Sequence, residues 1–182
     1  GLGNPGSSYT NTRHNIGFKI IDAINAHFKL SKQKPKFKGL LTTGNIEEKK
    51  IYAIKPLTFM NNSGICIREL LEYFKIDVED VIVFHDDLDI EFGKIKAKFG
   101  GSDAGHNGIA SIDKFIGKDY SRVRLGIGKP KTKMEVSDYV LQNFDEEEIN
   151  NIEQILENIT ESISILIKKK LDLFSSTVNN KK

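Results

Sequence analysis

Residues 81–89 of this chain are Val-Ile-Val-Phe-His-Asp-Asp-Leu-Asp, or VIVFHDDLD in one-letter code. The short apolar run from Val81 to Phe84 predicts a buried strand. Directly after it come His85, Asp86, Asp87 and Asp89. Open α/β sheets place their ligand sites at the carboxyl ends of their strands, which is where these polar residues fall. The stretch therefore predicts an α/β fold with a polar site at that edge of the sheet.

The segments on either side alternate between helical and strand-like periodicity. Helices are predicted over 16–29 and 63–75 and from residue 109 onward, and strands over 38–46, 50–55, 94–99 and 122–127. We expect a mixed, twisted β-sheet flanked by α-helices on both faces. A long amphipathic helix is predicted over about 145–170, with acids at its start and lysines at its end that suit the helix dipole. We expect the polar tail, 175–182, to be frayed.

The length of 182 residues and a charged content of 29% are typical of one soluble domain, and we expect it to span 1–182 as a monomer. The glycine-rich start at Gly1 lacks an apolar strand before it, so we expect that an N-terminal strand is missing from the sequence. No run of about 18 apolar residues predicts a membrane span, and no signal peptide pattern is present. The single cysteine, Cys66, lies among apolar residues and is interpreted as a buried structural thiol. A cytoplasmic location fits these features.

The distribution of charge is more informative than the net charge of +2, which alone does not indicate a nucleic-acid-binding protein. Acids crowd 145–148, whereas basic residues crowd 94–98, 122–124 and 129–133. These basic runs flank a glycine-rich loop, GGSDAGHNG, at 100–108. Any one of them could be an ordinary solvated face, but several around one loop favour an anionic partner.

Four polar clusters carry the candidate chemistry, and each also has a structural interpretation. They are GLGNPG at 1–6, TRHN at 12–15, TFMNNSG at 58–64, and HDDLD at 85–89 with GHNG at 105–108. The first is only a weak signature of a phosphate-binding site, and it equally fits a structural turn. Taken alone, His14 is more simply a core or capping histidine. Of the adjacent Asn61 and Asn62, one could cap the following helix and leave the other amide free.

Two common kinds of site find no support in these clusters. His85, Asp86, Asp87 and His106 could be metal ligands by residue type, but no H-x-x-x-H or C-x-x-C spacing is present, and we expect no metal. No G-x-S-x-G motif indicates a serine nucleophile. A histidine, a strand-end acid and several asparagines suit hydrolysis by an activated water instead, without a cofactor. The residues alone do not choose among His14, His85 and His106 as the base.

Six motifs in order resemble the bacterial peptidyl-tRNA hydrolase family. They are GLGNPG with Tyr9, TRHNIGF, TFMNNSG, HDDLD, GGSDAGHNG and RVRLGIGKP, and together they span residues 1–130. The part from residue 131 onward is similar only in general character. The resemblance implies hydrolysis of the ester between a peptide and the 3′-terminal ribose of tRNA, with peptidyl-tRNA bound through its acceptor stem and 3′ end.

The resemblance also implies roles for individual residues. His14 would be the general base and Asp86 the carboxylate that orients it. Asn4 and Asn61 would position the peptide and the water, and Asn107 would hold the water or the scissile ester from the other side. Tyr9, Phe59 and Met60 would line the peptide groove, and His106 would lie beside the acceptor end. A clamp on the tRNA 5′-phosphate would fall on Lys98 and Arg124, with Lys96 beside them. Ser102, Asp103 and Ala104 depart from the family's more glycine-rich loop, and Asp103 adds a negative charge near the expected path of the RNA.

Two alternatives stay open from the sequence. One is a non-catalytic RNA-binding protein of the same fold, such as the plant splicing factors that resemble this family. His14, Asp86 and Asn107 are all present, which favours an enzyme. The other is a nucleotide-binding α/β domain that uses the GLGNPG turn.

Overall fold

The computed structural model describes residues 1–130 and 133–181. Lys131 and Thr132, from the predicted basic run 129–133, and Lys182, at the end of the predicted tail, lie outside the described residues. Among the described residues, no helix combines the length and the apolar character needed to cross a membrane.

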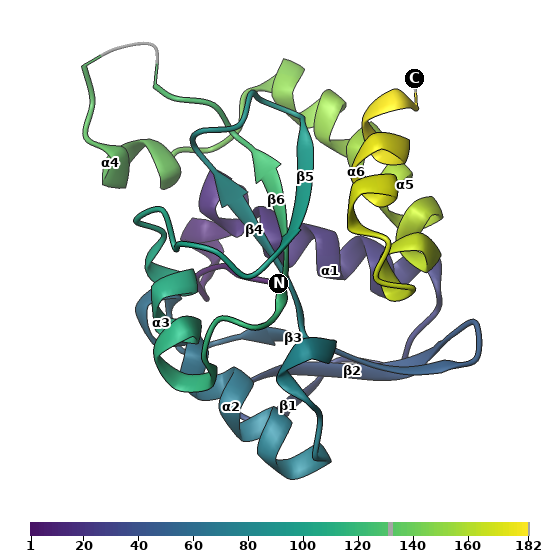
Figure 1. Ribbon diagram of the computed structural model, residues 1–182. Helices are drawn as coiled ribbons and strands as arrows, with labels where there is room; N and C mark the ends of the chain where they lie inside the picture. The colour runs from purple at the N-terminus through teal and green to yellow at the C-terminus, as the bar shows by residue number, and fades with distance from the viewer. Residues whose placement is uncertain (131–132, 182) are drawn as a thin grey trace.

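The strands form two three-stranded sheets (Figure 1), where the sequence predicts a single one. The first sheet is antiparallel, with β1 (Lys34–Lys36), β2 (Gly39–Ile46) and β3 (Lys49–Pro56) in that order. In the second, β6 (Ser121–Gly126) lies between β4 (Ile82–Asp87), to which it is parallel, and β5 (Ile95–Phe99), to which it is antiparallel. The predicted α/β class and the mixed character of the second sheet are confirmed.

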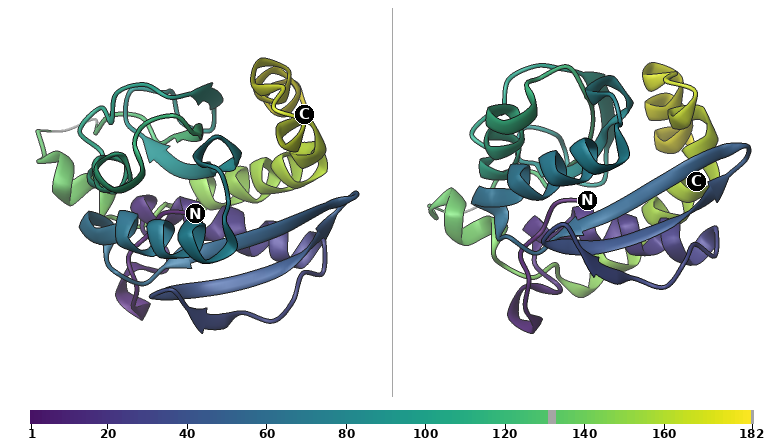
Figure 2. Two further views of the ribbon diagram at one scale, coloured as in Figure 1. Left: turned by 60° about the horizontal axis from the view of Figure 1, so that its bottom comes forward. Right: turned by 90° about the horizontal axis from the view of Figure 1, so that it is seen from below.

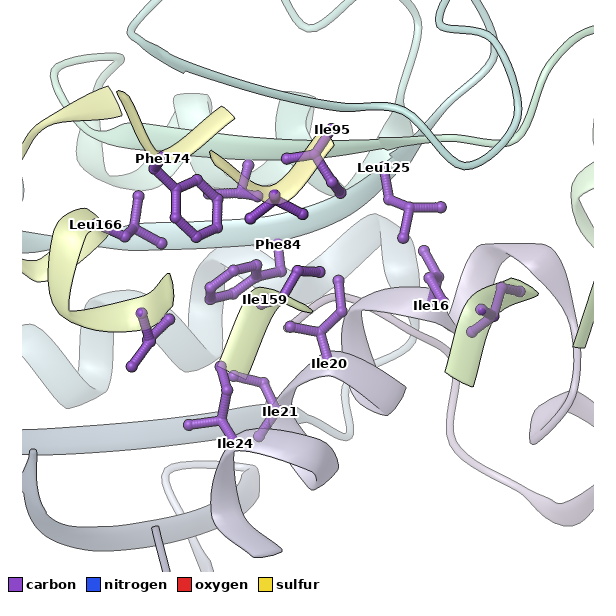
Figure 3. Close-up of a cluster of buried hydrophobic side chains, with 14 of the residues drawn as sticks. Ile16, Ile20, Ile21, Ile24, Phe84, Ile95, Leu125, Ile159, Leu166 and Phe174 are labelled. Atoms are coloured by element: carbon purple, nitrogen blue, oxygen red, sulfur yellow. The ribbon is translucent and has the colours of Figure 1, made fainter. Parts of the chain in front are cut away.

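Helices cover the second sheet on both faces, as predicted. They are α1 (Ile16–His27), α2 (Ser63–Phe74), α3 (Asn107–Ile116), α4 (Val136–Val140), α5 (Glu146–Ile167) and α6 (Leu171–Asn180). Because successive strand residues point to opposite faces, Phe84 packs with α1, α5 and α6 (Figure 3), whereas Val83 packs with α2 and α3. Strand β4 is therefore buried on both sides, which explains its continuous apolar run.

The C-terminal part differs from the prediction in two respects. The predicted helix over 145–170 ends at Ile167, and a turn with Lys169 at φ 58° leads into α6. The prediction of a frayed tail is wrong for residues 175–180, because these residues belong to α6. Phe174 and Val178 of α6 are buried, and the Asn179 side chain pairs with the Ile95 backbone of β5 in both directions.

Candidate active site

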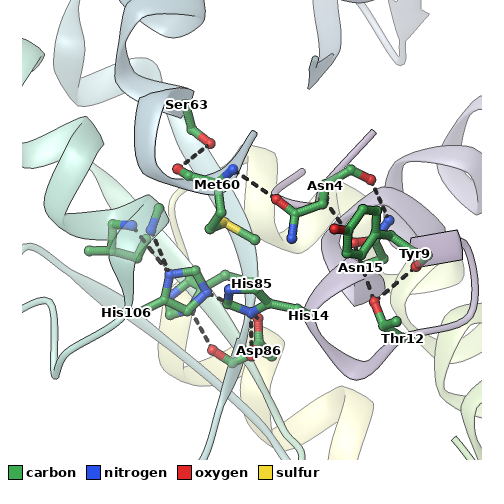
Figure 4. A network of polar contacts seen from close by, with 12 residues as sticks. Asn4, Tyr9, Thr12, His14, Asn15, Met60, Ser63, His85, Asp86 and His106 are labelled. Atoms are coloured by element: carbon green, nitrogen blue, oxygen red, sulfur yellow. Dashed lines mark hydrogen bonds and ion pairs between the residues drawn. The ribbon is translucent and has the colours of Figure 1, made fainter. Parts of the chain in front are cut away.

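The carboxyl end of β4 carries Asp86, and two histidines from distant segments converge on it (Figure 4). His14 lies in the 3-10 turn η2 (Arg13–Asn15), directly before α1. Its Nδ1 is 2.9 Å from Oδ1 and 3.0 Å from Oδ2 of Asp86. His106, at the N-cap of α3, places Nε2 3.0 Å from Oδ1 of the same carboxylate. His14 is 9% exposed and Asp86 is 3% exposed, so the pair is largely shielded from water.

The surrounding hydrogen bonds set the tautomers of these two histidines. Nδ1 of His106 accepts from the backbone N–H groups of Gly108 and Ile109, at 3.1 and 3.3 Å. Its proton must therefore be on Nε2, which donates to Asp86. An ionised carboxylate only accepts, so His14 also donates to it, from Nδ1. Neutral His14 is left with an unprotonated Nε2 that can accept a proton.

Asp86 is held in its ionised form by these neighbours. Burial alone would raise its pKa, but His14 and then His106, through charge and hydrogen bonds, hold the pKa of Asp86 well below its usual range. The carboxylate is thus a negative charge in a buried site, ready to stabilise a positive charge on an adjacent ring.

His85 differs from the other two histidines in its surroundings. It is 4% exposed, and its Nδ1 donates to the backbone oxygen of Asp86 at 2.7 Å. Its Nε2 is buried and finds no partner in the part of the chain that the structure describes. Burial, followed by the nearby charge of His106, holds the pKa of His85 well below its usual value. His85 is therefore a neutral, buried side chain. Of these three histidines, His14 is the one whose unprotonated ring nitrogen is neither enclosed nor hydrogen-bonded within the described residues.

His14, Asp86 and His106 could by distance hold a metal ion, since one ligand atom from each lies within 4.8 Å of the others. This set differs from the one considered from sequence, which included His85 and Asp87. Coordination through Nε2 of His106 would require its proton to move to Nδ1. That would remove both hydrogen bonds that cap α3, so the hydrogen-bonded arrangement is the better interpretation of these residues.

Asn4 reaches the site from the glycine-rich start of the chain. Its Oδ1 accepts from the backbone N–H of Met60 at 2.9 Å, which leaves its Nδ2 free to donate. Asn15 fixes the backbone of Asn4 from both sides, because its Oδ1 accepts from Asn4 N and its Nδ2 donates to Asn4 O, at 2.8 and 2.9 Å. Sequence reasoning missed Asn15, which is 2% exposed. Its place directly after His14 was the only available signal.

The other predicted residues of the TFMNNSG and GHNG motifs differ in how far they are buried. Met60 is buried, and the absence of a side chain at Gly108 gives it room, because a Cβ there would lie 2.4 Å from the Met60 sulfur. Asn61 and Asn107 are exposed, and neither side chain forms a hydrogen bond within the described residues. The Asn62 side chain makes no capping hydrogen bond to α2. Phe59 is 55% exposed and has φ 56°, which is uncommon for an aromatic residue.

Tyr9 is half-buried in the 3-10 turn η1 (Ser7–Tyr9). Its backbone oxygen accepts from the Thr12 hydroxyl at 2.9 Å, which ties this turn to the segment that carries His14. A cavity of about 670 Å³ begins beside Asn4 and Asn15 and continues between α1 and α5. His14 and Asp86 do not line it, so the cavity adjoins the chemical centre without containing it.

The predicted tRNA-binding residues gather on one face of the second sheet. Lys96 lies opposite Arg124 in the β5–β6 register, and Lys98 lies diagonal to it. The register thus places these cations close together, and burial, then the charges of Arg124 and Arg122, lower the pKa of Lys98. Arg124 also pairs with Asp87 at 3.2 Å. Arg122 is not available to a ligand, because it is 1% exposed and bonded to Asp113 and to the backbone of Ser102.

Asp103, the departure noted in the glycine-rich loop, has a local structural role. Its Oδ1 accepts from the backbone N–H of Gly105 at 2.7 Å, and its backbone oxygen accepts from His106 N at 2.9 Å. The carboxylate therefore shapes the turn that leads into His106.

Comparison with known proteins agrees with this geometry. The sequence model of the family described as peptidyl-tRNA hydrolase matches residues 1–182. A peptidyl-tRNA hydrolase of Pelagibacter ubique (strain HTCC1062) is 77% identical over 181 residues, which cover 100% of this chain and 97% of that relative. One of Ehrlichia canis (strain Jake) is 47% identical over 180 residues, or 99% of this chain and 92% of the relative. The crystal structure of peptidyl-tRNA hydrolase from Acinetobacter baumannii has a TM-score of 0.92 at 34% identity, covering 100% of this chain and 93% of that one.

Proposed function

The chain belongs to the peptidyl-tRNA hydrolase family and is an enzyme that hydrolyses the ester bond of peptidyl-tRNA, and we propose that it does so with a water molecule activated by His14. The observation that carries this proposal is the tautomer of His14. Its Nδ1 donates to Asp86 at 2.9 Å, and its Nε2 stays free to take a proton, whereas the other nitrogen of the cluster without a partner among the described residues, Nε2 of His85, is buried.

The reaction needs only one base and a few aligned dipoles. Nε2 of His14 removes a proton from water as the water oxygen attacks the ester carbonyl carbon. The carbonyl oxygen becomes an oxyanion, and the tetrahedral intermediate collapses with cleavage of the bond to the 3′-oxygen of the ribose. That oxygen takes the proton back from His14, so the products are a free peptide acid and tRNA. Asp86 stabilises the imidazolium that exists between the two proton transfers.

Asparagine amides supply the hydrogen bonds to the reacting groups. The Nδ2 of Asn4 is oriented as a donor, because its Oδ1 is occupied by Met60 N. It donates to a carbonyl of the peptide or to the oxyanion. Asn107 and Asn61, on the first turn of α3 and on η3 (Met60–Asn62), hold the water and the ester from the opposite side. Asn15 acts indirectly, because its hydrogen bonds hold the backbone of Asn4 in place.

The peptide lies against the apolar residues beside these amides. Tyr9, Phe59 and Met60 line its path, and the strained backbone at Phe59 directs an aromatic side chain toward solvent, where a ligand can cover it. Amides that read peptide carbonyls would disfavour aminoacyl-tRNA, which has a free amino group and no peptide bond.

His106 is assigned a positioning role in place of the predicted substrate contact. Both of its ring nitrogens are engaged, one with the α3 backbone and one with Asp86. No ring nitrogen remains for a hydrogen bond to the acceptor end. By donating to Asp86, it orients the carboxylate that His14 uses.

Lys98 and Arg124 bind the phosphates of the acceptor stem, with Lys96 beside them. Their mutual repulsion and partial burial, seen in the lowered pKa of Lys98, would be relieved by an anion between them. These contacts do not read sequence, which suits an enzyme that must accept many tRNAs. The protein acts as a monomer in the bacterial cytoplasm, where tRNA is used.

A direct assay tests the proposal. The protein is given peptidyl-tRNA and, separately, the matching aminoacyl-tRNA with a free amino group, and release of the acyl group is followed. Hydrolysis of the first with little of the second is expected. Binding of peptidyl-tRNA without release of peptide would support a non-catalytic RNA-binding protein instead.

A further inference from the structure

A second cationic surface lies on the β1–β3 sheet, away from Lys98 and Arg124. We call it the Lys–aromatic patch, and it consists of Lys34, Lys36, Phe37, Lys50, Tyr52, Tyr73 and Phe74. In the strand register, Lys34 of β1 lies opposite Leu41 of β2, and Leu41 lies opposite Ile54 of β3. Tyr52 is two residues before Ile54 on β3. Because alternate residues share a face, the three lysines and Tyr52 lie on the same side of the sheet. That is the side over which α2 lies (Figure 2).

The aromatic side chains of the patch form a connected cluster. The ring centroids of Tyr52 and Phe74 are 4.1 Å apart, and those of Phe37 and Tyr73 are 5.1 Å apart. The ammonium of Lys36 lies 3.9 Å from the centroid of Tyr73, which is 62% exposed. A cation held over an aromatic face in this way is positioned before any ligand arrives.

The segment that carries most of the patch has a much higher net positive charge than the chain as a whole. Residues 29–55 contain eight lysines and two glutamates, a net charge of +6 in a chain with a total of +2. Lys38 and Lys55 are neutralised by Glu69 and Asp22. Lys34, Lys36 and Lys50 are exposed and form no ion pair within residues 1–130 and 133–181.

Lysines on an edge strand also discourage unwanted strand pairing. That role accounts for Lys34 and Lys36 of β1. Strand β3 is the other edge of the same sheet, so this role covers Lys50 as well. It does not account for the exposed Tyr73 at the end of α2, nor for the aromatic rings that lie under the ammonium groups of Lys36 and Lys50. The convergence of three separate segments on one surface favours a binding role.

The patch is connected to the active site through two elements. Leu57 N donates to Lys38 O at 2.8 Å, so the β1–β2 turn adjoins the segment that leads to Phe59 and Met60. Helix α2 starts at Ser63, beside the active site, and its twelve residues end at Phe74 in the patch. At about 1.5 Å per residue, the patch is roughly 18 Å from the active-site end of the helix.

We infer that the Lys–aromatic patch binds the phosphate backbone of the tRNA substrate beyond its acceptor end. The inference rests on tRNA being the substrate. A duplex anchored with its 3′ end near His14 extends well past 18 Å, and its backbone is the most densely charged anion available to the patch. Phosphate contacts of this kind carry no sequence information and add affinity for any tRNA body.

The test compares full-length peptidyl-tRNA with a short peptidyl ester of the CCA trinucleotide. In a Lys34→Ala/Lys36→Ala/Lys50→Ala variant, KM for the full substrate rises about threefold to tenfold, while kcat and all constants for the short substrate stay unchanged. The slope of log affinity for deacylated tRNA against log salt concentration falls by about 2 to 3, because each lost phosphate contact removes about 0.9.

A matched control removes three lysines elsewhere. Lys168→Ala/Lys169→Ala/Lys170→Ala changes the turn between α5 and α6, where Lys168 and Lys169 already pair with Glu47 and Asp80. It should leave the salt slope unchanged, and replacing Lys34, Lys36 and Lys50 by arginine should preserve wild-type KM. An unchanged KM and slope in the alanine variant, or equal losses on both substrates, would overturn the inference. Failure of the wild-type protein to hydrolyse either substrate would instead count against the proposed function.

Discussion

Nδ1 of His14 lies 2.9 Å from Oδ1 of Asp86, and the same carboxylate accepts a second hydrogen bond from His106 at 3.0 Å. The two histidines are separated by 92 residues in the sequence, yet their ring centroids are 4.8 Å apart. Because His106 also caps α3, the start of that helix fixes one side of Asp86 while His14 occupies the other. His14, the proposed base, is thereby oriented by its hydrogen bond to Asp86.

Replacing Asp86 by asparagine tests the orientation of His14. An amide can donate to Nδ1 and so favour the tautomer with the proton on Nε2, which cannot accept a proton from water. We expect kcat to fall by about 10²- to 10⁴-fold with little change in tRNA affinity. Single-turnover hydrolysis and equilibrium binding of deacylated tRNA measure the two quantities separately. A loss of less than about threefold would mean that Asp86 does not set the tautomer.

The positioning role of His106 is tested by His106→Asn. Asparagine is a good N-cap, so α3 should stay folded, but its shorter side chain does not reach Asp86. We expect kcat to fall about tenfold at unchanged KM. The acid limb of the pH–rate profile should also move, because Asp86 then interacts with His14 alone. A rise in KM with an unmoved pH profile would indicate that His106 contacts the substrate instead.

The phosphate clamp makes a prediction about substrate size. Lys98→Ala and Arg124→Ala should each raise KM for full-length peptidyl-tRNA by about tenfold, because each loses a charge-assisted contact. A peptidyl ester of a single nucleoside, which has no 5′-phosphate of an acceptor stem, should be hydrolysed as by the wild type. Lys118→Ala provides a control for loss of one exposed lysine. Equal effects on the large and small substrates would argue against a clamp.

His85 predicts a dependence of stability on pH. In the unfolded chain a histidine has its ordinary pKa near 6.5, whereas burial holds the pKa of His85 in the folded protein well below that. The unfolded state therefore binds more protons below about pH 6.5, and stability falls as the pH falls, by at most about 1.4 kcal/mol per unit for this group. Asp86 acts in the same direction, but only below about pH 4, because its folded pKa is also lowered.

The contribution of His85 can be isolated with His85→Phe. Urea unfolding midpoints measured from pH 7 to pH 5 should fall less steeply in this variant than in the wild type. The absolute stability at pH 7 is not diagnostic, because the variant also loses the bond to the Asp86 backbone oxygen. Parallel pH dependences would show that His85 is not kept neutral by its environment.

Much of the fold was predictable where local patterns and tertiary packing agree. Strand β4 was predicted from four apolar residues followed by acids. Helix α5 was predicted from its apolar stripe and from the acids at its start, which form a capping box with Asp145. Two other features depend on contacts between segments far apart in the sequence, which no local pattern indicates. The division of the strands into two sheets follows from which strands pair, and α6 is stabilised by burial of Phe174 and Val178 within an otherwise polar tail.

The residues that could form the candidate site were predictable from the sequence, but their hydrogen-bonded arrangement was not. The polar clusters contained His14, Asp86, Asn4 and His106 because such residues are rarely grouped in a core. The residues alone did not distinguish His14 from His85 and His106, and His14 was proposed as the base through the family resemblance. The hydrogen-bond partners support that proposal, because they show that His85 is enclosed and that His106 is fully engaged. Asn15 could not be found from sequence, because its partner is a backbone segment eleven residues away.

The most direct test of the account is hydrolysis of peptidyl-tRNA by His14→Ala under single-turnover conditions, with tRNA affinity measured on the same preparation. If Nε2 of His14 takes the proton from the attacking water, the rate falls by at least about 10²-fold while the affinity for deacylated tRNA stays within twofold of wild type. A rate within about threefold of wild type would contradict the assignment of His14 as the general base.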